Sequence, residues 1–328
     1  MDQAVVAVDV MGGDYAPRVV VEGIRRAIDA DKNLRVVAVG LPDAIALLEG
    51  ADRVQCVGAS EVIAMDEHPA HAIRAKKDSS IVVGCKLVKS GDAGGFFSAG
   101  STGATMAAAT LGIGRIKGVT RPVLAAVLPG VPKPVILGDV GANADCRAEY
   151  LVQFAVMMQA YATSALGVDT PTVRLLNIGE EDSKGSMFAQ EVFALLKESV
   201  PHFQGNIEGK EILNSGTDII VTDGFTGNIV LKTLEGTSKV VLQQVKGALT
   251  ANLFSKLCAA PLAGQVKKLK AEMDPDQFGG APLLGVRGVV VIGHGSSNAT
   301  AIANGIRVTA TAIRNDLTKK ISSALPLA

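Results

Sequence analysis

AVVAVDVMGGDYAP, residues 4–17, decides the fold class, because a continuous apolar run ends in an Asp and then in a loop with two glycines. An apolar run without strict alternation is typical of a strand that is covered on both faces of a sheet. Segments with helical spacing of apolar residues separate this run from similar ones further along. The recurring order of strand, polar loop and helix predicts a three-layer α/β/α fold with a mostly parallel sheet.

Nine strands are expected from runs rich in Val, Ile, Leu or Ala. They are residues 4–10, 35–40, 53–58, 94–100, 122–129, 134–140, 172–179, 218–224 and 288–295. Six of the runs lead directly into polar loops, which are DVMGGDYAP (9–17), SAGSTGA (98–104), DVGANAD (139–145), NIGEEDSKG (177–185), TDGFTGN (222–228) and GHGSSNAT (293–300). Because the carboxyl ends of parallel strands share one edge of a sheet, we expect these loops to form one long polar cleft.

Each of these loops has two interpretations. Gly, Ser, Asn and Asp after a strand commonly form tight turns and helix caps. The same residues let backbone N–H groups approach an anion, and the N-terminus of the following helix adds partial positive charge. Repetition of the pattern in six loops favours an anion-binding cleft.

The composition permits a large core and disfavours nucleic acid as a partner. The chain has 328 residues, 48% of them hydrophobic, and we expect one catalytic unit over residues 1–328. Lys plus Arg equals Asp plus Glu at 32 each, and there are three Tyr and no Trp. The chain therefore lacks the basic excess of a dedicated nucleic-acid binder and offers little aromatic surface for stacking bases.

The sequence shows no marker of secretion, membrane spanning or metal binding. The first residues, MDQAVVAV, lack the basic start of a signal peptide, and no run approaches the roughly 18 apolar residues of a membrane span. We therefore expect a soluble intracellular protein. The four Cys and four His show no metal-ligand spacing, so neither a metal nor a cofactor is expected.

Residues 225–274 depart from the alternation of strands and helices, because they show mainly helical spacing with one clear break at Pro261. We expect a helical hairpin that stands off the sheet, over about residues 235–274. Its apolar stripe is explained either by packing on a second copy in a symmetric dimer or by contact of the tip with an anionic membrane surface. The expected tip residues are Leu253, Phe254 and Leu257.

Common catalytic fingerprints do not occur in the polar loops. No GxxxxGK[ST] loop is present, GxGxxG does not follow the first strand, and SAGSTGA lacks the GxSxG spacing of a serine hydrolase. Lys184 in NIGEEDSKG is either a solvated surface charge or a contact for an anionic substrate. Arg74 and Lys77, in HPAHAIRAKKDSS, are on their own best explained as a solvated face.

Read together and in order, the loops resemble one family, the bacterial phosphate acyltransferases (PlsX). The matching segments are AVDVMGGDYAP (7–17), HPAHAIRAKKDSS (68–80), FFSAGSTGA (96–104), DVGANADC (139–146), LLNIGEEDSKG (175–185), VTDGFTGNIVLKTLEG (221–236) and GGAPLLGVRGVVVIGHGSSNA (279–299). Together they span residues 7–299, which is nearly the whole chain.

The resemblance implies a fold similar to isocitrate and isopropylmalate dehydrogenases, a homodimer, and a cytoplasmic enzyme that associates peripherally with membrane. It also implies a reaction at the start of phospholipid synthesis. Inorganic phosphate attacks the thioester of a fatty acyl chain on acyl carrier protein and forms acyl phosphate, which a glycerol-3-phosphate acyltransferase would use next.

Two residues match positions thought catalytic in the family, Lys184 and Asn228. One would hold phosphate and the other would donate to the oxyanion, in either assignment. By extension from loop position, we expect the substrate or phosphate to be bound by Asp9, Gly12, Gly13, Ser98, Ser101, Thr102, Asn143, Asp223, Thr226, His294 and Ser296. Arg74 and Lys77 are expected to contact the carrier protein or its phosphopantetheine.

Three other functions are weighed against this one. Metal-dependent 2-hydroxyacid dehydrogenases of the related fold resemble GDILSD where this chain has GNIVLK, and Asn228 and Lys232 replace the acids that a hard cation requires. A phosphate acetyltransferase differs in its acyl donor, acetyl coenzyme A. A non-catalytic scaffold for lipid enzymes is disfavoured by the six convergent polar loops.

Overall fold

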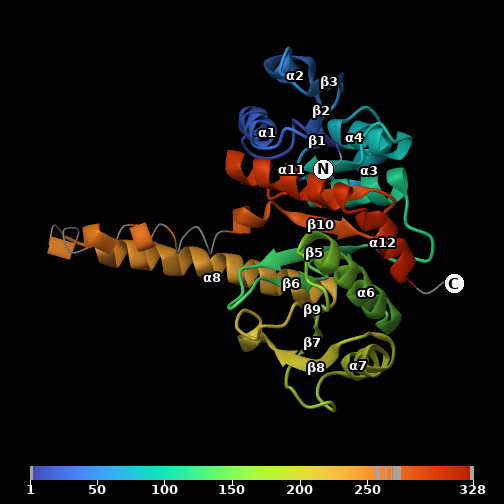
Figure 1. Ribbon diagram of the computed structural model, residues 1–328, viewed down its shortest axis with the longest axis vertical. Coiled ribbons are helices and arrows are strands. Elements are labelled where there is room, and N and C mark those ends of the chain that lie inside the picture. Colours follow the sequence, from blue (N-terminus) through green and yellow to red (C-terminus); the bar gives the residue numbers. More distant parts are fainter. Residues whose placement is uncertain are drawn as a thin grey trace.

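The computed structural model describes residues 3–252, 254–255, 259–262, 264–266, 268 and 275–325. Its strands form one eleven-stranded sheet in the order β3-β2-β1-β4-β11-β10-β5-β6-β9-β7-β8 (Figure 1). They are β1 (Ala4–Asp9), β2 (Leu34–Gly40), β3 (Val54–Gly58), β4 (Gly95–Ser98), β5 (Val123–Leu128), β6 (Val135–Gly138), β7 (Val173–Asn177), β8 (Phe203–Glu208), β9 (Ile219–Val221), β10 (Ala281–Leu284) and β11 (Val289–Ile292).

All nine strands expected from the sequence are confirmed, and two further strands, β8 and β10, are added. β8 forms one edge of the sheet and carries Gln204 and Asn206, so it lacks the continuous apolar run of the covered strands. β10 has only four residues and contains Pro282. Short or polar strands at an edge or in an antiparallel pair give a weak periodic pattern, which explains why both were missed.

The two halves of the sheet run in opposite directions. β3, β2, β1, β4 and β11 are parallel to one another, as are β6, β9, β7 and β8. Between these sets, β11 pairs antiparallel with β10, β10 with β5, and β5 with β6. The expectation of one shared edge for all six polar loops is therefore wrong, because the loops after β1, β4 and β11 lie at the edge opposite to those after β6, β7 and β9.

Helices cover both faces of the sheet, as expected for a three-layer α/β/α fold. The helices are α1 (Arg18–Ala30), α2 (Pro42–Ile45), α3 (Pro69–Ala75), α4 (Ser80–Ser90), α5 (Thr102–Ala108), α6 (Ala148–Ala165), α7 (Met187–Ser199), α8 (Gly224–Thr250), α11 (Ala299–Arg314) and α12 (Leu317–Ala324). One buried apolar cluster packs α1, α6, α7, α11 and α12 on one face, and a second packs α3, α4, α5 and the start of α8 on the other. Short 3₁₀ or π turns are η1 (Ala46–Leu48), η2 (Ala109–Ile113), η3 (Gly209–Glu211), η4 (Ala260–Leu262) and η5 (Pro275–Phe278).

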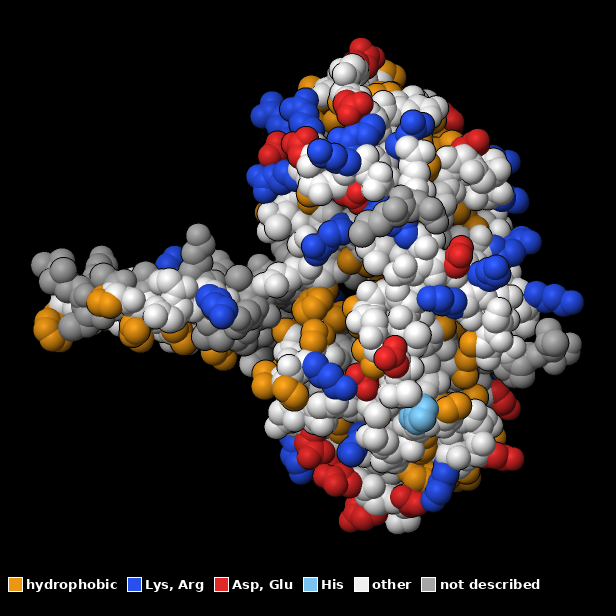
Figure 2. Space-filling view, viewed as in Figure 1, with side chains coloured by type: hydrophobic (Ala, Val, Ile, Leu, Met, Phe, Trp, Pro, Cys, Tyr) orange, Lys and Arg blue, Asp and Glu red, His pale blue; other side chains and the backbone are white. Residues whose placement is uncertain are grey.

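α8 has 27 residues, and its second half leaves the body as a long arm (Figure 1). The chain returns to the body at η5, which packs against α11. Hydrophobic side chains gather along one side of the arm and at its junction with the body (Figure 2). Of the expected tip residues, Phe254 is 76% exposed, whereas Leu253 and Leu257 lie outside the described residues. Within the described part of the chain, no helix has the length and hydropathy needed to span a membrane.

Gly227 fixes the start of α8 against the loop after β6. A methyl group on Gly227 would lie 1.9 Å from the carbonyl oxygen of Asp139, which belongs to the backbone and cannot rotate away. Gly236, further along α8, has no atom within 4 Å of the equivalent position. The two glycines therefore provide a matched test of this contact.

We expect Gly227→Ala to lower the free energy of unfolding by about 1–3 kcal/mol, because the added methyl group separates α8 from β6. Gly236→Ala should leave stability unchanged or raise it by up to about 1 kcal/mol through its higher helix propensity. Urea unfolding monitored by circular dichroism measures both values. Equal stabilities for the two variants would contradict a tight contact at Gly227.

Candidate active site

Asp9 ends β1 and joins the first polar loop to the loop after β4. Its buried carboxylate accepts hydrogen bonds from the backbone N–H of Met11 at 3.0 Å and from the hydroxyl of Ser98 at 2.7 Å. Ser98 Oγ in turn accepts from the backbone N–H of Gly100 at 3.0 Å. The side chains of Asp9 and Ser98 therefore fix the conformation of these loops from behind.

The glycines of the first loop are required by close backbone approach. A methyl group on Gly12 would lie 2.7 Å from the backbone nitrogen of Gly100, and Gly13 has a φ of +105°. The next residue, Asp14, donates its N–H to the carbonyl oxygen of Gly295 at 2.8 Å. The loops after β1, β4 and β11 thus form one packed cluster.

Asp139 has the same role in the second half of the sheet. Its buried carboxylate accepts hydrogen bonds from the N–H groups of Gly141, Ala142 and Asn143 at 2.7–3.1 Å, and from the amide of Asn143 at 2.7 Å. Burial raises the pKa of Asp139 above its ordinary value, and these hydrogen bonds oppose the rise. The backbone carbonyl of Asn143 accepts from the N–H of Gly224 at 2.9 Å, which connects this loop to the start of α8.

The side chain of Asp223 caps α8. It accepts from the N–H of Thr226 at 2.9 Å and from the hydroxyl of the same residue at 2.8 Å. Asn143, Asp223 and Thr226 therefore direct their side chains to neighbouring groups of the protein. Phosphate binding by these three residues stays a prediction.

Lys184 lies in a loop held by hydrogen bonds to its backbone. Its carbonyl oxygen accepts from the Asn177 amide at 3.1 Å, and its N–H donates to the carbonyl of Glu181 at 3.0 Å. Asn206 of β8 donates to that same Glu181 carbonyl at 2.8 Å. The Lys184 side chain is 48% exposed, and its Nζ is 3.9 Å from Glu181 Oε1, so the charge stays accessible to solvent.

A cavity of about 370 Å³ lies between α8 and the end of β11. α8 begins beside the loop after β6 and crosses the face of the sheet toward the loops after β4 and β11. Val230, Leu231 and Leu234 hold it on that face, because they pack on the core. Asn228 lines the cavity next to Gly141. The cavity therefore joins loops from opposite edges of the sheet.

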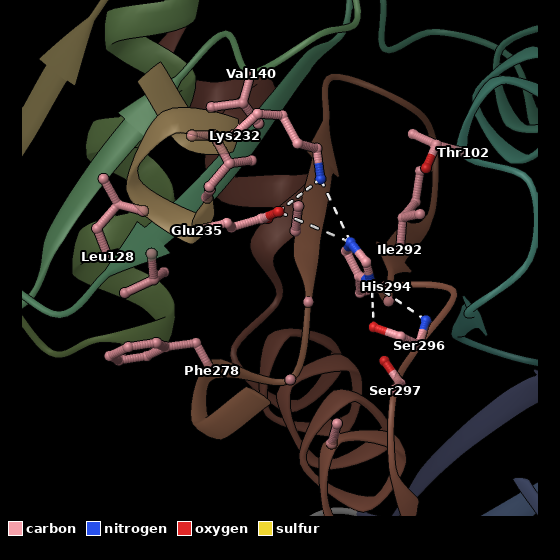
Figure 3. Close-up of a pocket in the computed structure, with 18 of the residues that line it drawn as sticks. Thr102, Leu128, Val140, Lys232, Glu235, Phe278, Ile292, His294, Ser296 and Ser297 are labelled. Atoms are coloured by element: carbon pink, nitrogen blue, oxygen red, sulfur yellow. Dashed lines mark hydrogen bonds and ion pairs between the residues drawn. The ribbon is translucent and has the colours of Figure 1, made fainter. Parts of the chain in front are cut away.

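A polar network crosses this cavity (Figure 3). Lys232 Nζ lies 2.9 Å from Glu235 Oε2 and 3.4 Å from His294 Nε2. On the other side of the imidazole ring, His294 Nδ1 lies 2.8 Å from Ser296 Oγ and accepts the N–H of Ser296 at 3.2 Å. The network links α8, from the second half of the sheet, to the loop after β11, from the first half.

The structure brings four of the predicted site residues to this cavity: Thr102, Asn228, His294 and Ser296. Asp9, Gly12, Gly13, Ser98 and Ser101 lie in the packed first-half loops, where Ser101 caps α5. Lys184 does not line the cavity, but its loop follows β7, which is next to β9 and ends at the same edge as the start of α8. Arg74 and Lys77 are exposed on and just after α3.

Sequence reasoning missed most of the residues that line the cavity, among them Glu235 and Phe278. The spacing of Asn228, Leu231 and Glu235 is a signal that marks one face of α8, and it was available from the sequence. Phe278 carries no such signal, because it reaches the cavity only after the chain returns from the arm.

Comparison with known proteins identifies the family. A model of the family described as "Fatty acid synthesis protein" matches residues 4–320. A phosphate acyltransferase of Desulfitobacterium hafniense (strain Y51) is 46% identical over 326 residues, which cover 98% of this chain and 97% of the relative. The chain belongs to this family of phosphate acyltransferases. The predictions of the family and of an acyltransferase enzyme are confirmed.

Solved structures show the same fold at lower sequence identity. A phosphotransacetylase from Streptococcus pyogenes matches with a TM-score of 0.60 at 18% identity, covering 95% of this chain and 94% of that chain. A 4-hydroxythreonine-4-phosphate dehydrogenase from Klebsiella pneumoniae matches with a TM-score of 0.53 at 12% identity, covering 95% and 98%. The expected likeness to dehydrogenases of this architecture is thus confirmed at the level of the fold.

Within the described residues, no group of three or more His, Cys, Asp or Glu side chains is placed to hold a metal ion. In α8, Lys232 lies beside Glu235 and His294, and its positive charge opposes the binding of a cation there.

The buried carboxyl of Asp9 provides a test of the first-half cluster. Burial raises its pKa above the ordinary value of 3.8, against hydrogen bonds from Ser80, Ser98 and Met11. The folded state therefore binds more protons than the unfolded chain just above pH 3.8, so this group contributes less stability as the pH rises through its folded pKa.

We expect the stability of Asp9→Asn relative to the wild type to increase as the pH rises from about 4 to about 7, because the variant cannot ionise. The lost hydrogen-bond geometry adds an offset that does not depend on pH. Urea unfolding of both proteins across this range measures the difference. A difference that stays constant or changes in the opposite direction would contradict the raised pKa.

Proposed function

We propose that the protein transfers a fatty acyl group from acyl carrier protein to inorganic phosphate and forms the acyl phosphate used in phospholipid synthesis. The observation that carries the proposal is the cavity between α8 and β11. One part of it bears Thr102 and Ser296, whose hydroxyl groups suit an anion, and another part is lined by Leu128 and Phe278 (Figure 3). A substrate with an anionic reacting end and a long apolar tail matches this division.

The reaction requires no covalent enzyme intermediate. An oxygen of phosphate dianion bonds to the thioester carbonyl carbon, the tetrahedral oxyanion collapses, and the carbon–sulfur bond breaks to release the carrier-protein thiolate. The thiolate then takes a proton from water. Phosphate is itself the nucleophile, so the enzyme has to orient it and stabilise the negative charge that develops on the carbonyl oxygen.

Lys184 and Asn228 are the residues proposed for these tasks. The Lys184 side chain carries an accessible positive charge, and its loop is held by backbone contacts that do not involve the ammonium group. No hydrogen bond among the described residues occupies the Asn228 amide, which is exposed in the cavity. Both groups are thus available to a substrate without rearrangement of their surroundings.

The apolar part of the cavity favours a fatty acyl donor over acetyl coenzyme A. A volume of about 370 Å³ falls within the usual range for ligand sites of about 300–1,000 Å³ and exceeds what an acetyl group needs. An acetyl donor stays the alternative, because the phosphotransacetylase from Streptococcus pyogenes has the same fold.

The proposal includes partners that the sequence resemblance implies. Acyl carrier protein would meet Arg74 and Lys77, which are exposed and suit an acidic partner. Exposed Val240, Val241 and Val245 on α8 suit a symmetric homodimer. In this proposal the enzyme works in the cytoplasm and rests against anionic membrane, where a glycerol-3-phosphate acyltransferase takes the acyl phosphate.

We expect Lys184→Ala and Asn228→Ala each to lower the rate of acyl-phosphate formation by about 10²–10³, because each removes one charge-stabilising group from the transition state. The assay mixes the protein with inorganic phosphate and palmitoyl carrier protein and measures palmitoyl phosphate.

Lys197→Ala is the matched control, because Lys197 pairs with Asp182 of the same loop at 3.0 Å but extends from α7. It should retain near-wild-type turnover. Wild-type rates in both Lys184→Ala and Asn228→Ala would remove these residues from the mechanism. If the wild type consumes acetyl coenzyme A and not palmitoyl carrier protein, the alternative donor is correct.

The arm gives a separate test of membrane contact. Phe254 and Leu262 are 76% and 51% exposed on it. Burying one such side chain in the membrane contributes ~1.5–3 kcal/mol to the free energy of vesicle binding. Replacing both with Ser should therefore weaken binding to anionic vesicles by about 10²-fold or more. Flotation with phosphatidylglycerol vesicles measures the binding.

Val131→Ser is the control, since Val131 is 69% exposed on the loop between β5 and β6. It should float like the wild type. If the arm variant keeps its vesicle binding but becomes a monomer by size-exclusion chromatography, these side chains form a dimer contact and the membrane role is wrong.

A further inference from the structure

One face of α8 lines the cavity from Asn228 to Leu242. Its lining residues are Asn228, Leu231, Lys232, Glu235, Ser238, Lys239 and Leu242. They recur at intervals of three and four residues, which places them along a single side of the helix. Leu242 follows Asn228 by 14 residues, which corresponds to about 21 Å along an α-helix.

β5 forms the floor of the cavity and runs in the same direction as this face of α8. Leu124, Ala126 and Leu128 alternate along it and line the cavity from one face of the strand. Leu124 lies at the Asn228 end, because its N–H and carbonyl bond to Asp139 and Val140. Leu128 lies at the other end of β5. Floor and helix therefore bound an elongated channel with Asn228 at one end.

Phe278 marks the far end of this channel, and its position is fixed. The next two residues are Gly279 and Gly280, with φ of +72° and +124°. A methyl group on Gly279 would lie 2.4 Å from the backbone of α11 at Asn304, and one on Gly280 would lie 2.5 Å from the carbonyl oxygen of Ile292. This tight packing holds the backbone that presents Phe278.

We infer that this face of α8 determines the length of the acyl chain that the enzyme accepts. The reacting thioester lies at Asn228, and the methyl end of the chain lies at Leu242 and Phe278. The inference rests on the proposed function and adds the residues that determine chain length. Figure 3 shows Leu128 and Phe278 on the side of the cavity opposite Thr102 and Ser296. Lys232 and Glu235 neutralise each other between the two sides, which permits an uncharged chain to pass.

The dimensions set the length of the preferred chain. With carbon–carbon bonds of ~1.5 Å, an extended chain advances about 1.3 Å per carbon, so about 16 carbons span the distance from Asn228 to Leu242. The face of α8 therefore predicts a preferred chain of about 16 carbons.

The test compares kcat/KM for acyl carrier protein loaded with chains of 8, 12, 16 and 20 carbons. The wild type should prefer the 16-carbon donor. Leu242→Trp should lower the ratio of the 16-carbon to the 8-carbon donor by at least about tenfold, because each methylene that no longer fits changes discrimination by about 10-fold or more. Phe278→Ala should raise the ratio of the 20-carbon to the 16-carbon donor.

Gln244→Trp is the matched control, because Gln244 is exposed two residues beyond Leu242 and does not line the cavity. It should keep the wild-type profile. A Leu242→Trp enzyme that forms acyl phosphate with an unchanged profile would overturn the inference and leave the proposed function intact. Failure of the wild type to form acyl phosphate from any donor would refute the proposed function itself.

A second measurement does not depend on turnover. Wild-type protein is mixed with palmitoyl carrier protein that carries a diazirine at the terminal carbon, and the mixture is irradiated. Fragmentation of the labelled peptides should place the label on Leu242 or Phe278. A label confined to Val240 and Gln244, which are exposed on the side of α8 opposite Leu242, would place the chain outside the channel and overturn the inference.

Discussion

The reversal of strand direction at the centre of the sheet determines how the loops can be brought together into one site. Since β10 and β5 pair antiparallel with their neighbours, the carboxyl ends of the two sets of parallel strands face opposite edges. Loops at opposite edges cannot form one site without a connecting element. α8 supplies that connection, because it starts at the second-half edge and reaches His294 at the other edge through Lys232.

The two edges are built by the same physical device. Asp9 and Asp139 follow the last apolar residues of central strands, are buried, and accept hydrogen bonds from the N–H groups of their own loops. A buried carboxylate is tolerated only when such donors surround it. The loops are thereby fixed before any ligand arrives, which is the preorganisation that catalysis by oriented dipoles requires.

The sequence was informative wherever local pattern decides structure. Nine covered strands appear as apolar runs, and the glycine-rich loops follow them. β10 escaped because it has only four residues and contains Pro282, and Phe278 escaped because the arm separates it from the rest of the cavity. The expectation that all six loops share one edge was wrong because the direction of each strand depends on its neighbours in the sheet. The sequence of a loop does not indicate that direction. Asn228 and His294 were found as loop-associated residues, but their meeting in one cavity follows from the path of α8.

Ion pairing distinguishes Lys232, which lines the cavity, from Lys184, which does not. Lys232 forms an ion pair with Glu235 at 2.9 Å, and its side chain is 51% exposed, so the pair adds little to stability. Its consequence is electrostatic, because a neutralised Lys232 offers a weak attraction to phosphate and leaves the adjoining wall compatible with a hydrocarbon chain. Lys184 has Glu181 only at 3.9 Å, beyond hydrogen-bonding distance, and keeps more of its charge for an anion. This contrast favours Lys184 over Lys232 as the cation that meets phosphate in the proposed reaction, and it makes Asn228, at the start of the apolar channel, the natural partner of the thioester carbonyl.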